Sequence, residues 1–455
     1  MNHTYGTAAD IDSAYAWLRL GAAALIGTIG NVGMWSVVVV LPAVQAEFGV
    51  DRGAASLPYT LTLIGFGFGG IIAGRIADRH GIMIPVIGGA VALGLGYIAT
   101  GYTQNLWQFA IAHGLLIGLL GTATTFAPLL ADITHWFNKR RGIALAICAS
   151  GNYLSGTIWP PILQASIDAF GWRVTHLALG VFCTVSLLLL APLLQRRPPH
   201  EAPAVAGNLP HEPSPALLRL RPVTLQALLV VAGLACCVAM SMPQVHIVAY
   251  CADLGFGAQR GAEMLSLMLG FGIVSRIISG IIADRIGGLY TLLLGSALQG
   301  IALCLYIPFD GLASLYVVSA LFGLFQGGIV PSYAFIVREY FSPKEAGARV
   351  GVVMMATLFG MALGGWLSGI IYDFTGSYQA AFLNGIAWNL LNLSIVLFLL
   401  WRRRSGRRRR VRATALPVAG RPARELPHAR YQASSRISIT SAGPLIFFGL
   451  RRTGA

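Results

Sequence analysis

The chain has 455 residues, of which 56% are hydrophobic and only 11% are charged. Soluble domains carry roughly a quarter charged residues, so this composition excludes an ordinary soluble protein and indicates a membrane protein with several spans. The formal net charge of +15 arises at one end, because residues 402–455 hold fourteen of the thirty-two Lys and Arg and a single acid, Glu425. A basic tail is expected to lie on anionic lipid, and it does not indicate nucleic-acid binding.

Twelve apolar stretches are long enough to cross a bilayer, which takes about 20 residues in a helix. Six of them precede a linker that is rich in proline and polar residues, at 196–221, and six follow it. The predicted spans are 18–43, 54–77, 82–103, 106–133, 141–166, 173–195, 222–250, 262–283, 289–308, 312–337, 348–371 and 379–401. We therefore predict an all-α membrane protein with an N-terminal segment (1–17), two six-helix halves (18–195 and 222–401) and an irregular tail (402–455).

A sequence repeat supports the two halves. IIAGRIADRHG (71–81) aligns without a gap with IISGIIADRIG (277–287), and each copy ends the second span of its half. The shared pattern G-x-x-x-D-R-x-G indicates an internal duplication. Its residues are either polar helix ends or parts of a gate: Gly74, Asp78, Arg79, Gly280, Asp284 and Arg285.

The short loops are strongly asymmetric in Lys and Arg. One side collects the Lys139–Arg141 cluster and the Arg402–Arg410 run, whereas the other side has only Arg52, Arg173 and Arg260. Because the basic side of a membrane protein faces the cytoplasm, both termini and the linker are expected there. The expected location is the inner (plasma) membrane of a cell.

These features together resemble the major facilitator superfamily. Three segments are similar to bacterial members of its monocarboxylate transporter branch, which includes the oxalate/formate antiporter: 41–61 (LPAVQAEFGVDRGAASLPYTL), 136–163 (WFNKRRGIALAICASGNYLSGTIWPPIL) and 171–173 (GWR). The resemblance implies alternating access of two halves around a central site. It also implies that the two motif copies lock the cytoplasmic side while the cavity faces outward.

Arg276 is the leading candidate for substrate binding. A charge in the middle of a span costs about 3 kcal/mol on insertion scales, so it is kept for a partner or a ligand. In the oxalate/formate antiporter, a span-8 arginine four residues before the motif glycine binds the substrate carboxylate, and Arg276 stands in that relation to Gly280. The structural alternative is an arginine satisfied by backbone carbonyls or by Asp132.

The chain departs from that branch in ways that leave the coupling mechanism open. No charge occurs between Arg349 and Asp373, where the oxalate exchanger has a lysine, which argues against a dicarboxylate held by two charges. Gly272 occupies the place where animal monocarboxylate transporters carry an aspartate thought to hold a proton. The basic pair that often completes the loop signature is absent after both motif copies.

Further polar residues within the spans could complete a central site, or could only bond a neighbouring helix. With Arg276 they favour a monoanion with an apolar or aromatic body: Asn31, Asn152, Tyr153, Gln244, His246, Gln326 and Tyr333. Three titratable residues are candidates for proton coupling, although structural roles remain open for each: His113, His246 and Asp132.

The sequence carries no nucleotide-binding loop, no metal-ligand spacing and no nucleophile–base arrangement, so we expect neither an enzyme nor a cofactor. The six cysteines fit neither a zinc site nor a disulfide framework. We predict a monomeric secondary active transporter for a small carboxylate. Two alternatives stay open: transport of a neutral or cationic solute by proton antiport, and a membrane sensor that binds without transport.

Overall fold

The structure is a computed structural model that describes residues 10–197 and 220–415, and within them it contains helices and loops but no β-strand. The N-terminal half comprises α1 (Ala14–Gly30), α2 (Val32–Phe48), α3 (Arg52–Ala55), α4 (Leu57–His80), α5 (Met83–Gly101), α6 (Leu106–Ile111), η2 (Ala112–Gly121), η3 (Thr122–Thr125), α7 (Ala127–Ile133), α8 (Arg141–Phe170), α9 (Trp172–Leu190) and η4 (Ala191–Leu194). The C-terminal half comprises α11 (Pro222–Asp253), α12 (Ala258–Ile286), α13 (Gly288–Leu305), α14 (Leu312–Gln326), α15 (Ile329–Tyr340), α16 (Pro343–Thr375) and α17 (Tyr378–Ala415).

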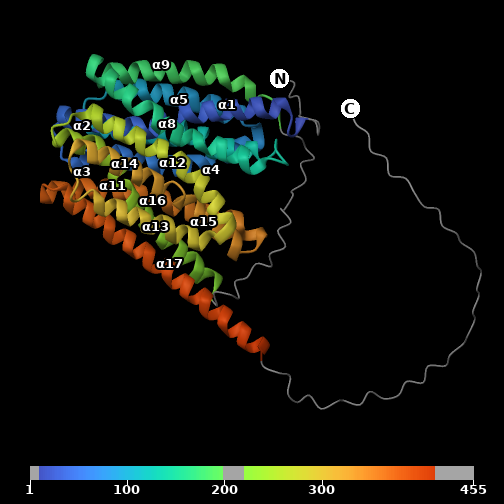
Figure 1. Cartoon of the computed structure of the whole chain (residues 1–455). Helices are drawn as coiled ribbons and strands as arrows, with labels where there is room; N and C mark the ends of the chain where they lie inside the picture. Colours follow the sequence, from blue (N-terminus) through green and yellow to red (C-terminus); the bar gives the residue numbers. More distant parts are fainter. Residues whose placement is uncertain (1–9, 198–219, 416–455) are drawn as a thin grey trace, which may run out of the picture. The chain divides into compact units, whose positions relative to one another are not determined.

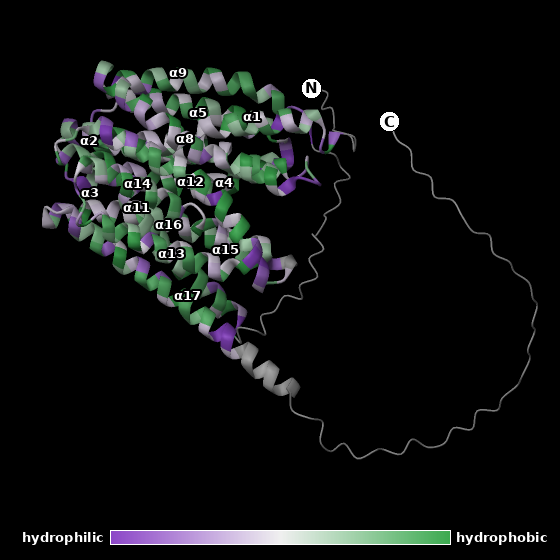
Figure 2. Cartoon of the chain, in the orientation of Figure 1, coloured by the Kyte–Doolittle hydropathy of each residue, from purple (hydrophilic) through white to green (hydrophobic). Residues whose placement is uncertain are grey.

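Each of the twelve predicted spans corresponds to one helix or to consecutive helices. Among the described residues, eleven of these segments are long and apolar enough to cross a membrane. The twelfth, α8, has 30 residues but carries polar side chains such as Asn152 and Gln164. α8 packs against α1, α2 and α12, and its buried residues include Tyr153, Ser155 and Gln164. In Figure 2, hydrophobic residues follow the middles of the helices and hydrophilic residues gather at their ends.

Several spans that the sequence predicts as single helices are interrupted. Span 1 breaks at Asn31, between α1 and α2, and span 10 breaks between Gln326 and Ile329. Span 4 passes through a π-helix and a 3₁₀-helix, and Phe126 (φ −130°, ψ −80°) starts its last turn. Span 7 stays continuous around Pro243. The interruptions fall on the first and fourth spans of a half, and interrupted helices at matching places point toward a central binding site.

The repeated sequence has a repeated backbone. α4 ends at Gly81 with φ 88° and ψ 158°, and α12 ends at Gly287 with φ 85° and ψ 162°. In both copies the glycine N–H bonds the carbonyl four residues earlier, on Ala77 or Ala283. A positive φ favours glycine, so the last residue of the motif is a helix stop in both halves.

The prediction of an irregular tail from residue 402 is corrected for its first part, because α17 continues past Trp401 to Ala415. Residues 1–9 and 416–455, and the 198–219 part of the predicted linker, lie outside the described residues. Residues up to Arg408 form one compact unit, and every contact discussed below lies within it.

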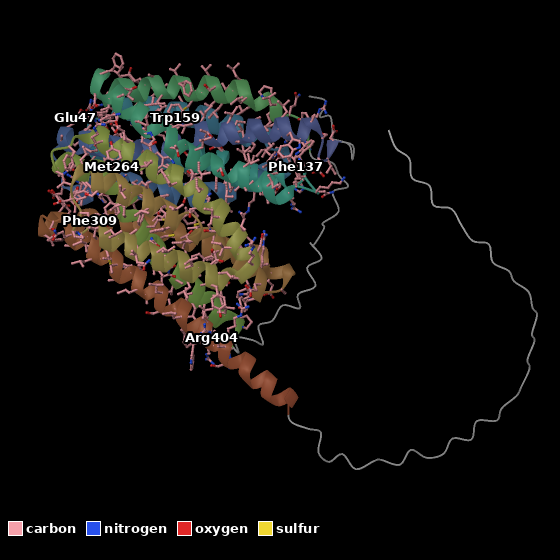
Figure 3. The ribbon with its side chains drawn as sticks, in the orientation of Figure 1. Glu47, Phe137, Trp159, Met264, Phe309 and Arg404 are labelled. Carbon is pink, nitrogen blue, oxygen red and sulfur yellow. The ribbon has the colours of Figure 1, made fainter. Side chains whose placement is uncertain are left out.

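Two ends of the helix bundle matter for function. The end with α3 we call the Arg52 end, and Glu47 and Phe309 lie there (Figures 1 and 3). The end with Gly81 and Gly287 we call the motif end, and Phe137 and Arg404 lie on that side (Figure 3). One buried hydrophobic cluster lies entirely in the N-terminal half, and a second combines residues of both halves, such as Trp35 and Leu269.

Candidate functional site

Arg276 reaches from the C-terminal half to the N-terminal half. It lies on α12, and its guanidinium carbon is 3.9 Å from the centroid of the Tyr153 ring on α8. Its Nη1 donates a hydrogen bond to the carbonyl oxygen of Ala149, also on α8, at 3.3 Å. Its Nε is buried without a hydrogen-bond partner. Within the described residues no acidic side chain pairs with Arg276, so its charge is held by a ring face and one carbonyl.

The alternative that Asp132 satisfies Arg276 is wrong. Asp132 forms a two-pronged ion pair with Arg19 on α1, with both N–O distances at 2.8 Å. Arg19 is fully buried, and its guanidinium also lies 4.5 Å from the Trp136 ring centroid. Arg19 was not anticipated, because it lies only five residues after the start of α1. A role of Asp132 in proton coupling stays a prediction, and Asp132 would have to leave this pair to act.

The Tyr153 ring explains why position 272 is glycine. A Cβ at Gly272 would lie 2.3 Å from Cε1 and 2.6 Å from Cδ1 of Tyr153. Real Cβ atoms do not approach ring carbons so closely, so the ring occupies the space that any larger side chain would need. Because the Tyr153 ring fills the space next to Gly272, one turn before Arg276, an acidic side chain does not fit at that position.

Asn152 precedes Tyr153 in α8 and is contacted by a tryptophan that the sequence reasoning missed. Nε1 of Trp35, on α2, donates to the backbone and side-chain oxygens of Asn152 at 3.2 and 3.3 Å. A Cβ at Gly156 would meet Leu269 at 2.2 Å and Trp35 at 2.8 Å, so Trp35 also lies close to α12. A tryptophan far from a span end departs from the usual interfacial placement, which is a signal that could have identified it.

The remaining candidates bond within their own halves, and none of them hydrogen-bonds Arg276. Gln244 Nε2 donates to Gln326 Oε1 at 3.0 Å, and His246 Nε2 lies 2.8 Å from the Gly365 carbonyl. Tyr333 donates to Asn392 on α17 at 3.0 Å, inside the C-terminal half. Asn31 donates to Gly27 O at the break in span 1. Four polar atoms of these residues are buried without a partner in the described structure: Asn31 Oδ1, Gln244 Oε1, Gln326 Nε2 and His246 Nδ1.

His113 lies apart from Arg276, in the π-helical part of span 4. Its Nδ1 is 2.8 Å from Thr62 Oγ1, and its ring centroid is 6.5 Å from that of His176. His176 is 1% exposed and was missed because it follows the start of span 6 by only a few residues. Its Nδ1 lies 2.9 Å from Thr100 Oγ1. The two histidines form an aromatic cluster within the N-terminal half.

The gate candidates are separated in this structure. Asp78, Arg79, Asp284 and Arg285 are exposed, and no side-chain hydrogen bond or ion pair joins them to the other half in the described part of the chain. A Cβ at Gly74 or at Gly280 would meet no heavy atom within 4 Å. The two halves therefore do not touch at the motif glycines.

Contacts between the halves begin at the Arg52 end instead. The hydrogen bonds that join them, among described residues, involve Arg52, Gly53, Thr60, Ser266 and Arg276. Arg276 is the one nearest the motif end, because α12 runs from the Arg52 end to Gly287. The candidate site thus lies where the closed part of the seam between the halves ends.

Comparisons with solved structures agree with this architecture. A bacterial homologue of the human lysosomal transporter Spinster, in an inward-facing and occupied conformation, superposes with a TM-score of 0.66 at 13% identity, over 86% of this chain and 97% of that chain. A peptide transporter, POT, gives a TM-score of 0.67 at 13% identity, over 85% and 95%. At these identities the likeness establishes the fold alone.

Sequence relatives narrow the family. "Monocarboxylate transporter 13" of Bos taurus is 28% identical over 337 residues, which are 73% of this chain and 77% of that protein. "Monocarboxylate transporter 11" of Homo sapiens is 27% identical over 396 residues, or 82% and 80%. The family model described as "Major Facilitator Superfamily" matches residues 23–314 and 264–450. The predicted fold class and the resemblance to the superfamily and its monocarboxylate transporters are confirmed, whereas the likeness to bacterial members stays a prediction. This chain is a multi-pass membrane protein that belongs to the major facilitator superfamily.

Proposed function

We propose that this chain is a secondary transporter that moves a small organic anion by alternating access, with Arg276 as the group that binds the substrate carboxylate. The observation that carries the proposal is the state of Arg276. It is a cation at membrane depth, it has no acidic partner among the described residues, and it touches both halves. Intramembrane charges of this kind mark substrate and ion pathways.

The geometry suits a carboxylate. A guanidinium can donate two parallel hydrogen bonds to one carboxylate, and Arg276 uses only one donor, in a long bond to the Ala149 carbonyl. A substrate carboxylate would bind side-on to the unpartnered Nε and to Nη2, while Nη1 keeps its bond to the Ala149 carbonyl. The Tyr153 ring stabilises the cation and holds its plane in place. The bound anion would neutralise Arg276 and so allow the two halves to move past each other.

The surroundings favour a monoanion with an apolar or aromatic body. The Tyr153 ring lies against Arg276, and the Gln244–Gln326 pair of the C-terminal half has one acceptor and one donor to spare. α16 has no charged residue between Arg349 and Asp373, so a second carboxylate would find no cation there. The excess of Lys and Arg in the loops at the motif end supports a cytoplasmic position of that end, and in this orientation the structure corresponds to a carrier that is closed toward the outside.

The test is uptake of radiolabelled monocarboxylates into proteoliposomes. We expect Arg276→Gln to lower uptake at least about 100-fold, because loss of a charge-assisted bidentate bond costs about 3 kcal/mol. Arg276→Lys should restore part of the uptake, since it keeps the charge but not the fork. Arg260→Gln is the matched control, because it removes an exposed arginine at the start of the same helix. Full uptake by a folded Arg276→Gln protein would refute the site.

Tyr153 provides a second test of the same site. A cation–π contact is worth about 0.5–2 kcal/mol, so Tyr153→Leu should raise KM by roughly 2- to 30-fold, whereas Tyr153→Phe should stay near the native value. An equal effect of both changes would show that the hydroxyl, and not the ring, matters. Uptake of a cation or a neutral solute with proton counterflow would favour the alternative of a proton antiporter. Binding of a solute without counterflow would favour the alternative of a membrane sensor.

A further inference from the structure

The Arg52 end holds a polar cluster that joins the halves and that the transport site does not include. Arg52, at the start of α3, is the sole contributor from the N-terminal half to an ion pair between halves among the described residues. Its Nη2 lies 3.0 Å from Asp253 Oδ2, at the end of α11. Its Nη1 donates to the Tyr378 hydroxyl, which in turn donates to Asp253 at 3.0 Å.

A second acid holds the backbone of the same residue. Asp373, near the end of α16, accepts the N–H of Arg52 at 2.8 Å and the N–H of Gly53 at 2.6 Å. The first turn of a helix leaves its N–H groups unpaired, and here a carboxylate from the other half satisfies two of them. Both functional parts of Arg52, its side chain and its amide, are therefore bound by the C-terminal half.

Aromatic rings and close backbone packing seal the cluster. The Arg52 guanidinium lies 5.0 Å from the Tyr372 centroid, and the Tyr372 and Tyr378 rings are 4.3 Å apart. A Cβ at Gly369 would lie 2.9 Å from the Arg52 carbonyl oxygen and 2.9 Å from Gly53 Cα, so α16 touches α3 backbone to backbone. These contacts hold α3 against α16, and the halves cannot part at this end without losing them.

The cation of this ion pair is much less exposed to solvent than the acid, and this difference affects how strong the pair is and how far salt can weaken it. The Arg52 side chain is 7% exposed, whereas Asp253 is 35% exposed. The shielded cation gives the pair more strength than a surface ion pair, while ions and water still reach the acid. The other ion pairs of the described residues stay within one half, as Arg19–Asp132 and Arg403–Glu339 do.

We propose that Arg52 is the latch of the outer entrance: its bonds to Asp253, Asp373 and Tyr378 hold the transporter closed at the Arg52 end, and they break each time the site opens to that side. The inference rests on the alternating access of the proposed function. Breaking these bonds would be compensated by new contacts at the motif end, where the two copies of the loop motif now stand apart. Arg52 contacts no solute in this scheme, so it is a positioning residue for the transport cycle.

The test uses distance measurements by pulsed electron spin resonance on the full-length protein in lipid nanodiscs, with no solute added. Spin labels replace the exposed side chains of Tyr102 and Phe309 at the Arg52 end, or of Arg140 and Arg338 at the motif end. All variants carry Cys304→Ser, because Cys304 is the exposed cysteine of the described residues.

Arg52→Gln and Asp253→Asn should each increase the long-distance fraction at the Arg52 end at least threefold and shorten the distance at the motif end. Arg52→Lys and Tyr378→Phe should shift both in the same directions but less. Raising the salt concentration from about 0.05 to about 1 M should give a smaller shift in the same direction in the native protein and no further shift in Arg52→Gln, because salt screens a partly exposed pair only in part. Arg173→Gln is the control, since it breaks an outer ion pair within one half.

Unchanged distances in Arg52→Gln and in Tyr378→Phe would overturn the latch, and the conservative Tyr378→Phe protein keeps the test decisive if Arg52→Gln fails to fold. The two proposals fail separately. If the distances shift as expected but the native protein takes up no monocarboxylate, the substrate is refuted and the latch stands. If carboxylate uptake needs Arg276 but the distances stay unchanged in the Arg52 variants, the latch is refuted and the substrate stands.

Discussion

The Arg52 end and the motif end of the bundle contain similar residues in opposite states. At the Arg52 end, glycines of α3 and α16 touch backbone to backbone, and an arginine crosses from one half to the other. At the motif end, the glycines of α4 and α12 face open space, and four charged residues have no partner in the other half among the described residues. The difference teaches that similar glycines and charges join the halves at one end of this structure and not at the other, and the proposed alternating access would reverse the two ends.

The largest loss of stability is expected from breaking an ion pair that lies within one half, and this change serves as a contrast to the ion pair between the halves. Asp132→Asn should lower the free energy of unfolding by about 3–5 kcal/mol, because it leaves the fully buried Arg19 without its counter-ion. Thermal unfolding in detergent would measure the loss, and spin-label distances should not change. The double variant Arg19→Met, Asp132→Leu should recover most of the stability. A conformational shift in Asp132→Asn would show that this pair, too, belongs to the gating contacts.

Gly369→Ala tests the closed end directly. The new Cβ would press on the backbone of Arg52 and Gly53, and overpacking of this kind costs about 1–3 kcal/mol. We expect the protein to shift toward opening at the Arg52 end while it remains folded, as read from the Tyr102–Phe309 label distance. If only the unfolding temperature fell, Gly369 would be a packing residue of both states.

Arg173→Gln removes the ion pair with Glu47, which lies at the Arg52 end but within the N-terminal half. Both side chains are about one-third or more exposed, so the expected loss of stability is only about 0.2–1 kcal/mol. Transport and label distances should match those of the native protein. A large effect on either would mean that any charge at this end controls the entrance, and it would weaken the role given to Arg52.

Gly280→Ala should have the smallest effect on the present state, since its Cβ would meet nothing within 4 Å. The unfolding temperature is expected to stay within the experimental error. Transport should nevertheless fall, because the motif glycines let two helices approach closely when the motif end closes. Unchanged transport in both Gly280→Ala and Gly280→Leu would show that α12 does not pack there in any state.

Much of the architecture follows from local patterns. Hydrophobic length places every span to within several residues, and the two copies of the repeated motif, which indicated a duplication, have the same backbone at Gly81 and Gly287. The interruptions of spans 1, 4 and 10 were not predicted. They fall on Asn31, on Thr122–Thr125 and on Gly327 and Gly328, and because such residues also occur inside unbroken membrane helices, hydrophobic length alone does not locate a break. The continuation of α17 to Ala415 was missed because an arginine-rich sequence has a normal helix propensity but no apolar period.

The candidate site is predictable only in part. Arg276 stands out in the sequence because a lone charge in an apolar segment is costly, and Asn152 and Tyr153 were named with it. The structure brings Arg276 against Tyr153, whereas Asn152 bonds Trp35. Tyr333 bonds a neighbouring helix at Asn392, and Asn31 bonds the Gly27 carbonyl at the end of its own helix. Their role in binding remains a proposal. Arg19, Trp35 and Arg52 were missed, since their partners lie more than 100 residues away along the chain.

The sequence by itself determined that this chain crosses the membrane repeatedly, that it is duplicated, and which basic loops lie on one side. These properties depend on hydrophobic length, on local repeats and on charge count, none of which requires knowing what touches what. Only the tertiary structure decided that Asp132 belongs to Arg19, that Tyr153 fills the space over Gly272, and that the halves meet at Arg52 and part at the motif glycines. Pairings between distant segments depend on helix packing, and the packing is set by many weak contacts at once rather than by any single stretch of sequence.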